Sequence, residues 1–305
     1  MPLSRTASGN LFALLATVVW SGNFVVARGL AETLSPVELS FWRWGIAFLA
    51  IIPFAAKSLK RSLPLLRGLW GKVILMALLG VTLFNTFIYE AGHTTGATNM
   101  ALLATTSPVV LAVVAHLFLR ERLSRFQLSG LCLAMIGVMI LVSRGSLAAL
   151  LGLTFARGDL LMVAAVLMFS IYSLMLRCRP KDFPQTAFLA LLIGIGVLGL
   201  IPPLLLQAVS EGLHPLSLPT LSALVYLGVG ASVVSFLAWS LAVERIGMVR
   251  AGIIYNSVPL FASLEAAFFL GESVSLPQIV GGTLIIGGIC FSSLGDFLAT
   301  ERAPR

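Results

Sequence analysis

The chain has 305 residues, of which 58% are hydrophobic and only 10% are charged, and its mean hydropathy is +1.02. Apolar runs of 18 residues or more recur along it, which excludes a water-soluble globular protein and predicts a polytopic α-helical membrane protein. The runs do not alternate apolar with polar residues, so a β-barrel is set aside. The net charge of +8 lies in short connectors, a pattern that argues against a nucleic-acid partner.

The apolar runs predict ten membrane spans. Each is long enough to cross about 30 Å of hydrocarbon at about 1.5 Å per residue. In chain order they cover residues 8–31, 36–55, 69–91, 95–119, 124–142, 158–178, 184–208, 218–243, 248–270 and 275–296. The first run lacks a convincing cleavage site and is expected to be retained as a span. The connectors leave no room for a soluble domain, so the protein is expected to act in or beside the lipid bilayer.

Basic residues in alternate connectors predict the orientation. One side, which includes both termini, carries Arg5, Lys57, Lys60, Arg61, Arg67, Lys72, Arg120, Arg122, Arg125, Arg177, Arg179, Lys181, Arg245, Arg250, Arg302 and Arg305. The other side carries only Arg144 and Arg157, with Arg28 near a helix end. Because cytoplasmic loops are enriched in Lys and Arg, both termini are expected in the cytoplasm.

A stretch of the chain is present twice. Residues 96–124 align with residues 247–275, which places Pro108 on Pro259 and Glu121 on Glu272. Further matches between the halves are Gly9 with Gly158, Ser21 with Ser170, Arg28 with Arg177, Pro36 with Pro184, Gly130 with Gly281 and Gly137 with Gly288. The predicted fold is therefore all-α, with two five-helix repeats at residues 1–147 and 155–298. Since five is odd, the second repeat inserts in the opposite orientation, giving an inverted-topology repeat.

The two prolines fall near the middle of the fourth and ninth spans. Proline removes a backbone hydrogen bond and clashes with the preceding turn, so both positions predict kinks. One interpretation is that the kinks only shape the bundle, with neighbouring hydroxyls binding the freed carbonyls. The other is that Pro108 and Pro259 line a cavity and act as bending points. The glycines of the fifth and tenth spans predict close helix packing, with a dimer contact as the alternative.

Polar and aromatic residues recur at mid-membrane depth, where an unpaired amide costs several kcal/mol. The candidate binding residues are Trp20, Asn23, Asn85, Tyr89, Asn99, Thr106, Tyr172, Trp239, Tyr255 and Asn256. For any one of them, hydrogen bonding between helices is the simpler explanation. As a set they predict a central cavity for a partly polar, partly aromatic solute.

Three charged residues fall within or near the spans: Arg43, Glu90 and Glu265. Such residues are costly in lipid and are candidates for charge coupling. A structural salt bridge or snorkelling to the interface competes with that hypothesis. Glu121 and Glu272, at helix ends, are expected to be boundary or capping residues.

No metal or cofactor site is expected. The three cysteines show no CxxC spacing and the three histidines no HExxH, and no aspartate pair lies at membrane depth. An intramembrane enzyme needs such a set, and a channel needs a filter-like run, so neither alternative is favoured.

With its repeat and the run SPVVLAVVAHLFLRERLS, the chain resembles the drug/metabolite transporter superfamily in its ten-span EamA branch, over essentially its full length. The most specific parts are the doubled proline-to-glutamate segments and the run WSGNFVVAR from Trp20 to Arg28. Within the branch it is most similar to bacterial aromatic amino acid exporters. The second repeat departs from the first where residues 116–120 (HLFLR) face residues 267–271 (AFFLG).

The resemblance implies a bacterial inner-membrane carrier that exports small metabolites. Together with the candidate residues, it predicts export of small amphipathic solutes, amino acids foremost, by alternating access around a central cavity. Drugs, nucleosides or other metabolites are the alternative substrates. A monomer and a homodimer both fit the sequence, which does not reveal the energy coupling.

Overall fold

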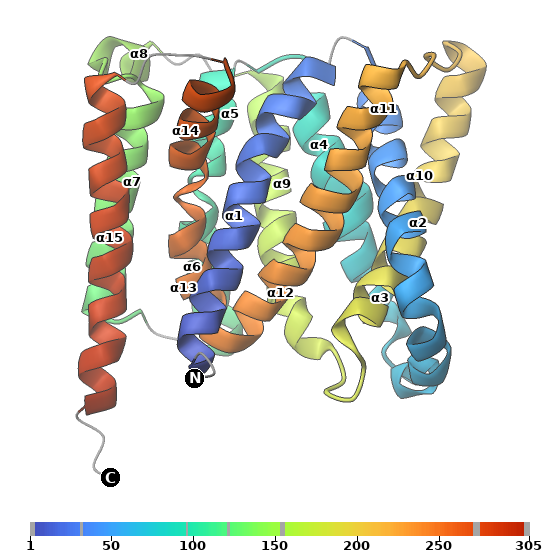
Figure 1. The fold of residues 1–305 in the computed structure, drawn as a ribbon, viewed down its shortest axis with the longest axis horizontal. Coiled ribbons are helices and arrows are strands. Elements are labelled where there is room, and N and C mark those ends of the chain that lie inside the picture. The colour runs from blue at the N-terminus through green and yellow to red at the C-terminus, as the bar shows by residue number, and fades with distance from the viewer. Residues whose placement is uncertain are drawn as a thin grey trace.

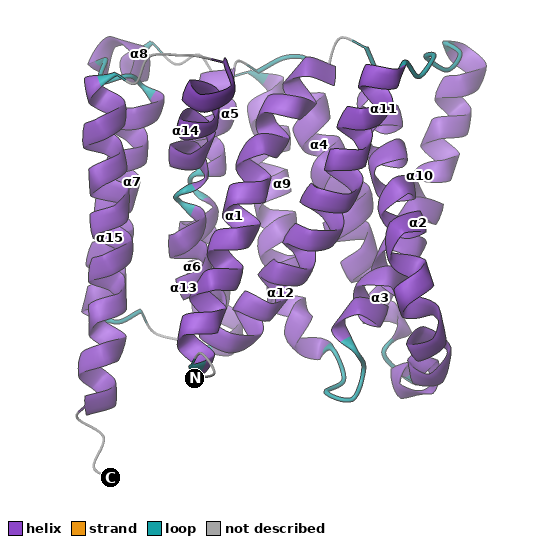
Figure 2. Ribbon diagram, in the orientation of Figure 1, coloured by secondary structure: helices purple, strands orange, loops and turns teal. Residues whose placement is uncertain are grey.

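In the computed structural model the chain is helical throughout the part described, which comprises residues 4–30, 33–95, 97–120, 123–152, 156–270 and 275–301 (Figures 1 and 2). The elements in order are α1 (Arg5–Leu30), α2 (Pro36–Ser62), η1 (Leu63–Leu66), α3 (Trp70–Ala77), η2 (Leu78–Leu83), α4 (Phe84–Ala91), α5 (Ala97–Ala104), α6 (Ser107–Leu119), α7 (Arg125–Val142), α8 (Leu147–Leu151), α9 (Arg157–Met175), η3 (Leu176–Cys178), α10 (Gln185–Ser210), α11 (Leu218–Val225), η4 (Tyr226–Val234), α12 (Ser235–Ile246), α13 (Met248–Tyr255), α14 (Val258–Leu270) and α15 (Leu276–Glu301).

Seven helical runs in the described residues are long and apolar enough to cross a membrane. They are Pro36–Leu66, Trp70–Ala91, Met100–Leu119, Arg125–Val142, Arg157–Cys178, Gln185–Ser210 and Leu218–Ile246. Helices α1, α13 with α14, and α15 occupy the other three predicted spans, whose crossing of the bilayer stays a prediction.

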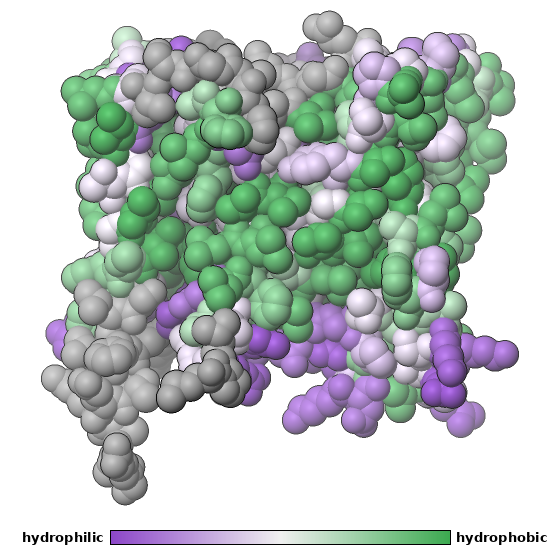
Figure 3. All heavy atoms as spheres, in the orientation of Figure 1, coloured by the Kyte–Doolittle hydropathy of each residue, from purple (hydrophilic) through white to green (hydrophobic). Residues whose placement is uncertain are grey.

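The outer surface fits a bilayer. Large apolar side chains point outward, including Phe54 at 84% and Leu206 at 74% exposure. On the face seen in Figure 3, apolar residues cover the middle, and hydrophilic residues gather at the lower end. The start of α1 and the end of α15 both lie at this lower end in Figure 1. The arrangement is that of a polytopic membrane protein.

The fourth and ninth predicted spans are each broken just before their proline. α5 ends at Ala104 and α6 starts at Ser107, while α13 ends at Tyr255 and α14 starts at Val258. Hydroxyls near the breaks bind carbonyls one turn back: Thr105 to Leu102, Thr106 to Leu103 and Ser107 to Ala104, each at 2.6 Å, and Ser257 to Ile254 at 2.7 Å. Both predicted spans are therefore broken at their proline, and the Ala104 carbonyl, which Pro108 leaves without an N–H partner, accepts from the Ser107 hydroxyl.

Two π-helical segments interrupt the third and eighth predicted spans at corresponding places. η2 covers Leu78–Leu83, and η4 covers Tyr226–Val234. In η4 the Ser232 hydroxyl donates to the carbonyl of Leu227, five residues back, at 2.9 Å. A π-segment widens the turn and turns backbone carbonyls away from the helix axis. The Ala231 carbonyl lies within η4 and accepts hydrogen bonds from side chains of other helices.

Helix α2 starts at a capping box, which fixes its register. The Ser35 side chain accepts from the Glu38 N–H at 3.2 Å, and the Glu38 carboxylate accepts from the Ser35 N–H at 3.1 Å. Pro36 stands in the first turn, where its missing N–H costs nothing. Arg43 follows two turns later and points into the bundle, where it is fully buried.

The helices pack in matched pairs. α2 packs on α10 and α7 on α15; α1 contacts α12 and α14, whereas α9 contacts α4 and α6. A Cβ at Gly130 would lie 2.5 Å from the Gly288 carbonyl oxygen, and one at Gly137 would lie 2.6 Å from that of Gly281. α7 and α15 are therefore antiparallel and in backbone contact, which only glycine permits. Each helix of the first predicted half has a counterpart in the second. Replacing each helix by its counterpart turns the contact of α1 with α12 into that of α9 with α4, and the contact of α1 with α14 into that of α9 with α6.

Candidate functional site

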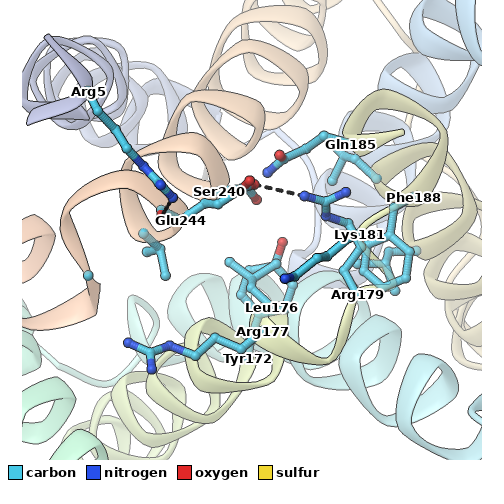
Figure 4. Close-up of a pocket in the computed structure, with 14 residues that line it drawn as sticks. Arg5, Tyr172, Leu176, Arg177, Arg179, Lys181, Gln185, Phe188, Ser240 and Glu244 are labelled. Atoms are coloured by element: carbon cyan, nitrogen blue, oxygen red, sulfur yellow. Dashed lines mark hydrogen bonds and ion pairs between the residues drawn. The ribbon is translucent and has the colours of Figure 1, made fainter. Parts of the chain in front are cut away.

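A cavity of about 560 Å³ reaches the surface at the lower end of the molecule, between α9, α10 and α12 (Figure 4). We call it the basic pocket. Its lining residues are Arg5, Tyr172, Leu176, Arg177, Arg179, Lys181, Gln185, Phe188, Leu189, Leu192, Ser240, Val243, Glu244 and Gly247. Four of these side chains are cationic and one is anionic, so the pocket has a net positive lining.

Part of that charge is paired at the rim. Arg179 forms an ion pair with Glu244 at 2.8 Å, and Arg5 donates to the Glu244 carbonyl at 3.2 Å (Figure 4). The Arg179 guanidinium also binds the Phe183 carbonyl in the α9–α10 connection. These contacts tie the start of α1 and the α9–α10 connection to α12 around the opening.

The inner end of the pocket meets an aromatic cluster. The cluster consists of Trp20, Phe169, Tyr172, Phe236, Trp239 and Tyr255. Trp20 lies at its centre, with ring centroids 5.5 Å from Phe236, 5.6 Å from Trp239, 5.7 Å from Phe169 and 5.8 Å from Tyr255. Three of these contacts are edge-on, a favourable geometry. The rings fill the middle of the bundle and close the basic pocket from above.

The indole N–H groups of the cluster are both satisfied. Trp239 donates to the Ser173 hydroxyl at 3.0 Å, and Trp20 donates to the Ala231 carbonyl at 2.9 Å. The second bond uses the carbonyl that the π-helical segment η4 presents. Because the same carbonyl also accepts from Arg43 at 3.1 Å, it joins the aromatic cluster to the polar layer beyond it.

That polar layer surrounds Arg43, whose side chain is fully buried. We call Arg43 and the residues that hydrogen-bond to it the Arg43 cage. The guanidinium donates to Ser232 Oγ at 2.6 Å, Tyr89 Oη at 2.7 Å, Asn23 Oδ1 at 2.8 Å, Asn85 Oδ1 at 3.0 Å and the Ala231 carbonyl. These acceptors come from α1, α4 and η4. All five acceptors are neutral, and within the described residues Arg43 has no charged acceptor.

Helix α1 connects all of these parts through four consecutive residues. Trp20 enters the aromatic cluster, the Ser21 hydroxyl lies 2.7 Å from Glu265 Oε1, and Asn23 binds Arg43. Between them, Gly22 lets the Tyr226 hydroxyl approach the backbone, where a Cβ would collide with it. Each of the four residues from Trp20 to Asn23 thus has a different partner, and its side chain, or for Gly22 the lack of one, permits that contact.

Most of the candidate binding residues lie close together. Trp20, Tyr172, Trp239 and Tyr255 belong to the aromatic cluster, and Asn23, Asn85 and Tyr89 to the Arg43 cage. Thr106 instead caps a carbonyl at the α5–α6 break. Asn256 is 1% exposed, and neither atom of its amide has a hydrogen-bond partner in the described structure. The side chain of Asn99 lies outside the described residues, as do Glu121 and Glu272.

The predicted central cavity stays a prediction. The aromatic side chains pack on one another, and only Tyr172 among the candidates lines the open pocket. Of the charged candidates, Arg43 is caged by neutral groups and Glu265 lies beside Ser21, whereas Glu90 is exposed near the end of α4. No salt bridge joins Arg43 to either glutamate within the described residues.

Sequence reasoning missed several residues of this site. Phe169, Phe236, Ser232 and the Ala231 carbonyl were not among the candidates, although all are buried at the centre. A signal for Phe169 was available, because it lies 149 residues after Trp20, the offset that matches Ser21 with Ser170. The Ala231 carbonyl lies in a π-helical segment, whose position hydropathy does not reveal.

Chemically, the pocket and the cluster together suit a small amphipathic molecule. The cationic lining favours an anionic group, while the aromatic wall offers apolar and stacking contacts. Polar groups without partners, such as the Asn256 amide, mark where a ligand or water has hydrogen bonds to gain.

The EamA-like transporter family matches residues 7–143 and 156–294. An uncharacterized transporter of Bacillus subtilis, YyaM, is 24% identical over 283 residues, covering 92% of each chain. Probable amino-acid metabolite efflux pumps are also similar, at 28% identity in Salmonella typhimurium (93% of this chain, 94% of that one) and 26% in Escherichia coli (93% and 94%).

The fold also matches a solved crystal structure with a TM-score of 0.76. That match covers 97% of this chain and 99% of the other, at 21% sequence identity. At this identity the likeness concerns the fold alone.

Proposed function

Because this chain belongs to the EamA-like transporter family, we propose that it exports small amphipathic metabolites, aromatic amino acids foremost, from the cytoplasm across a bacterial inner membrane. The observation that carries the proposal is the basic pocket, whose cationic lining leads to an aromatic wall. The carboxylate of an amino acid fits the cationic lining, and an aromatic side chain fits the aromatic wall. Relatives named as probable amino-acid metabolite efflux pumps support this substrate class.

The proposed mechanism is alternating access between two inverted five-helix repeats, residues 1–147 and 155–298. The two stretches matched to the family, the paired π-segments and the paired helix breaks all support the duplication. In such carriers the substrate site lies between the halves near the bilayer midplane. We propose the aromatic cluster for this site, because Trp20 from one half contacts Phe169 and Trp239 from the other.

The structure supports an inward-facing state under this proposal. Both termini and the basic pocket are at the end whose connectors are rich in Lys and Arg, the end expected to face the cytoplasm. Toward the other end, the aromatic cluster and the Arg43 cage fill the interior. A solute can then enter from the cytoplasm and stop at Tyr172, before the cluster opens.

The two helix breaks are the proposed bending points. A Cβ on Gly252 would lie 3.4 Å from the Pro108 Cα, so α13 crosses α6 at the break of the other half. Bending at Pro108 or Pro259 would therefore move both broken helices. Since the hydroxyls, not long-range contacts, satisfy the carbonyls at each break, a bend costs few hydrogen bonds.

Glu265 is the proposed site of charge coupling. Its Oε2 atom is buried without a partner, and Oε1 contacts the Ser21 hydroxyl, which also lies 2.5 Å from the Val18 carbonyl. Because that hydroxyl has only one hydrogen, a proton on Glu265 would let both bonds form. Exposed Glu90 lacks such a setting.

The experiment is counterflow of labelled aromatic amino acids into proteoliposomes, with nucleosides and cationic drugs as competitors. We expect saturable flux that unlabelled aromatic amino acids inhibit most strongly. No saturable flux for any amino acid would refute the amino-acid proposal. Glu265→Gln should lose transport driven by a pH gradient yet retain exchange, while the matched Glu90→Gln should behave as the wild type. The same preparation, analysed for mass in detergent, separates a monomer from a homodimer.

A further inference from the structure

The Arg43 cage and the inner end of the basic pocket occupy corresponding places in the two halves. Tyr172 lies 149 residues after Asn23, Leu192 lies 149 after Arg43, and Ser240 lies 151 after Tyr89. These offsets fall within the range of 148 to 151 that aligns Pro36 with Pro184 and Gly96 with Gly247. The first members of these pairs are hydrogen-bonded to each other, whereas the second members line an open cavity.

In an inverted repeat, the two halves exchange conformations when the carrier turns over. The second half, whose α9, α10 and α12 now surround the basic pocket, would adopt the closed arrangement, and the first half, which supplies Arg43, Asn23 and Tyr89, would open. An outer pocket would then appear between α1, α2 and α4, in the place that α9, α10 and α12 now hold around the basic pocket. Its lining would include Asn23, Arg43 and Tyr89.

The charge of the cage indicates what such a pocket would bind. A buried guanidinium is costly at membrane depth, and replacing an ion by apolar residues is often neutral or stabilising. Arg43 nevertheless stands there with only neutral acceptors among the described residues, and the Nδ2 atom of the adjacent Asn85 has no partner. At the corresponding place the other half has Leu192, so packing in the fold does not itself require an arginine.

We propose that Arg43 is the anion-binding residue of an outer pocket, open when the basic pocket is closed, and that its ligand is the carboxylate of the transported solute. This inference rests on the proposed function. When α1, α4 and η4 move apart, the guanidinium loses neutral acceptors and keeps its charge. A carboxylate replaces two of them with a planar, bidentate pair of hydrogen bonds, a geometry that arginine offers and lysine does not.

The first test measures access from each side. In a background with Cys132, Cys178 and Cys290, all exposed and free, changed to serine, Ser232→Cys marks the cage and Ser240→Cys marks the basic pocket. A membrane-impermeant thiol reagent is added to right-side-out vesicles, where it reaches the outer face of the protein, or to inside-out vesicles, where it reaches the cytoplasmic face. We expect Ser232→Cys to react from the outside and Ser240→Cys from the inside. A transport-competent Ser232→Cys protein that never reacts from the outside overturns the inference.

The second test measures ligand class. Counterflow of an aromatic amino acid is compared with that of its amide, in the wild type, Arg43→Lys and Arg43→Gln. We expect the wild type to prefer the acid by at least about tenfold, Arg43→Gln to lose most of that preference while still moving the amide, and Arg43→Lys to keep part of it.

The outcomes separate the two proposals. A wild type that moves neither acid nor amide refutes the proposed function. A wild type that moves the acid, with Arg43→Gln preferring it as strongly, overturns only the role of Arg43. If Arg43→Gln does not fold, Ser232→Cys decides: we expect external amino acid, but not its amide, to slow its labelling by severalfold, and equal protection by both overturns the inference.

Discussion

The basic pocket and the Arg43 cage face each other across the aromatic cluster, and they manage charge in opposite ways. The pocket has its cations at a rim, where Arg179 and Glu244 pair and solvent reaches them. The cage holds one cation in the interior and surrounds it with five neutral acceptors from three elements. In the open basic pocket the charged groups are accessible to water. In the Arg43 cage, where no opening is described, nearly all hydrogen-bond donors of the guanidinium have acceptors.

Under the proposed alternating access, the two regions differ in the free energy that their rearrangement would cost. Closing the basic pocket has to bring together side chains such as Tyr172 and Leu192, which cannot form a polar network. Opening the cage breaks hydrogen bonds to a charged donor, each of them stronger than a neutral bond. Trp20 lies between the two regions and contacts both, through its ring and through the Ala231 carbonyl.

The largest expected effect comes from removing that connection. Trp20→Ala deletes a ring packed against four others and leaves the Ala231 carbonyl with Arg43 alone, so we expect the free energy of unfolding to fall by about 3–5 kcal/mol. Thermal unfolding in detergent measures it. Trp70→Ala, at a side chain that is 42% exposed, is the matched control, with an expected loss well below that. Equal losses for the two would mean that the cluster does not join the regions.

Overpacking the pocket side is the next prediction. A Cβ on Gly80 would lie 2.7 Å from Cε2 and 2.9 Å from Cγ of Tyr172, a buried ring with no free direction to move except toward the pocket. We expect Gly80→Ala to lower the free energy of unfolding by about 1–3 kcal/mol and to slow transport. Gly45→Ala meets nothing within 4 Å and should be neutral or stabilising by about 0.5–1 kcal/mol. Tolerance of Gly80→Ala in both assays would contradict the packing.

Two tyrosines in corresponding regions distinguish the cage from the pocket. Tyr89→Phe removes an acceptor of Arg43, so we expect the free energy of unfolding to fall by about 1–3 kcal/mol. The Tyr172 hydroxyl is buried without a hydrogen-bond partner in the described structure, so Tyr172→Phe should leave stability nearly unchanged and raise the KM for the solute. Measuring thermal unfolding and counterflow on both variants tests this. A stability loss confined to Tyr172→Phe would reverse the assignment.

The smallest effect is expected at the rim. The side chains of Arg179 and Glu244 are 14% and 49% exposed, so we expect Glu244→Gln to lower the free energy of unfolding by less than about 1 kcal/mol. That difference should shrink further at about 1 M salt, where the Debye length is about 3 Å. Unfolding at low and high salt measures it. A salt-insensitive loss of several kcal/mol would show that the rim is not solvent-exposed.

Local features of the sequence predicted much of the fold. Continuous apolar runs gave the helical segments, because a helix that faces lipid needs no contact pattern beyond hydrophobicity. The breaks beside Pro108 and Pro259 followed from the lost N–H of proline, and hydroxyls that bind nearby carbonyls stand within three residues of each proline. The convergence of Trp20, Tyr172, Trp239 and Tyr255 was also anticipated, since an internal repeat places equivalent depths together.

Contacts between distant residues were beyond such reasoning. Arg43 stood out as a charge in an apolar run, yet its acceptor Ser232 lies 189 residues away and its acceptor Ala231 lies in a π-helical segment. Nothing local tells whether aromatic residues line a space or fill it. Here they pack on one another, and the basic pocket lies below them between α9, α10 and α12.

By itself, then, the sequence determined the features that depend on hydropathy, proline and repetition: a polytopic helical membrane protein, the positions of its helices and breaks, and the small set of residues at its centre. Only the tertiary structure decided which of the two ends is open, and that Arg43 meets neutral acceptors instead of Glu90 or Glu265. The physical reason is that hydrophobicity acts on each segment separately, whereas a cage or a cavity depends on how three or four helices pack against one another.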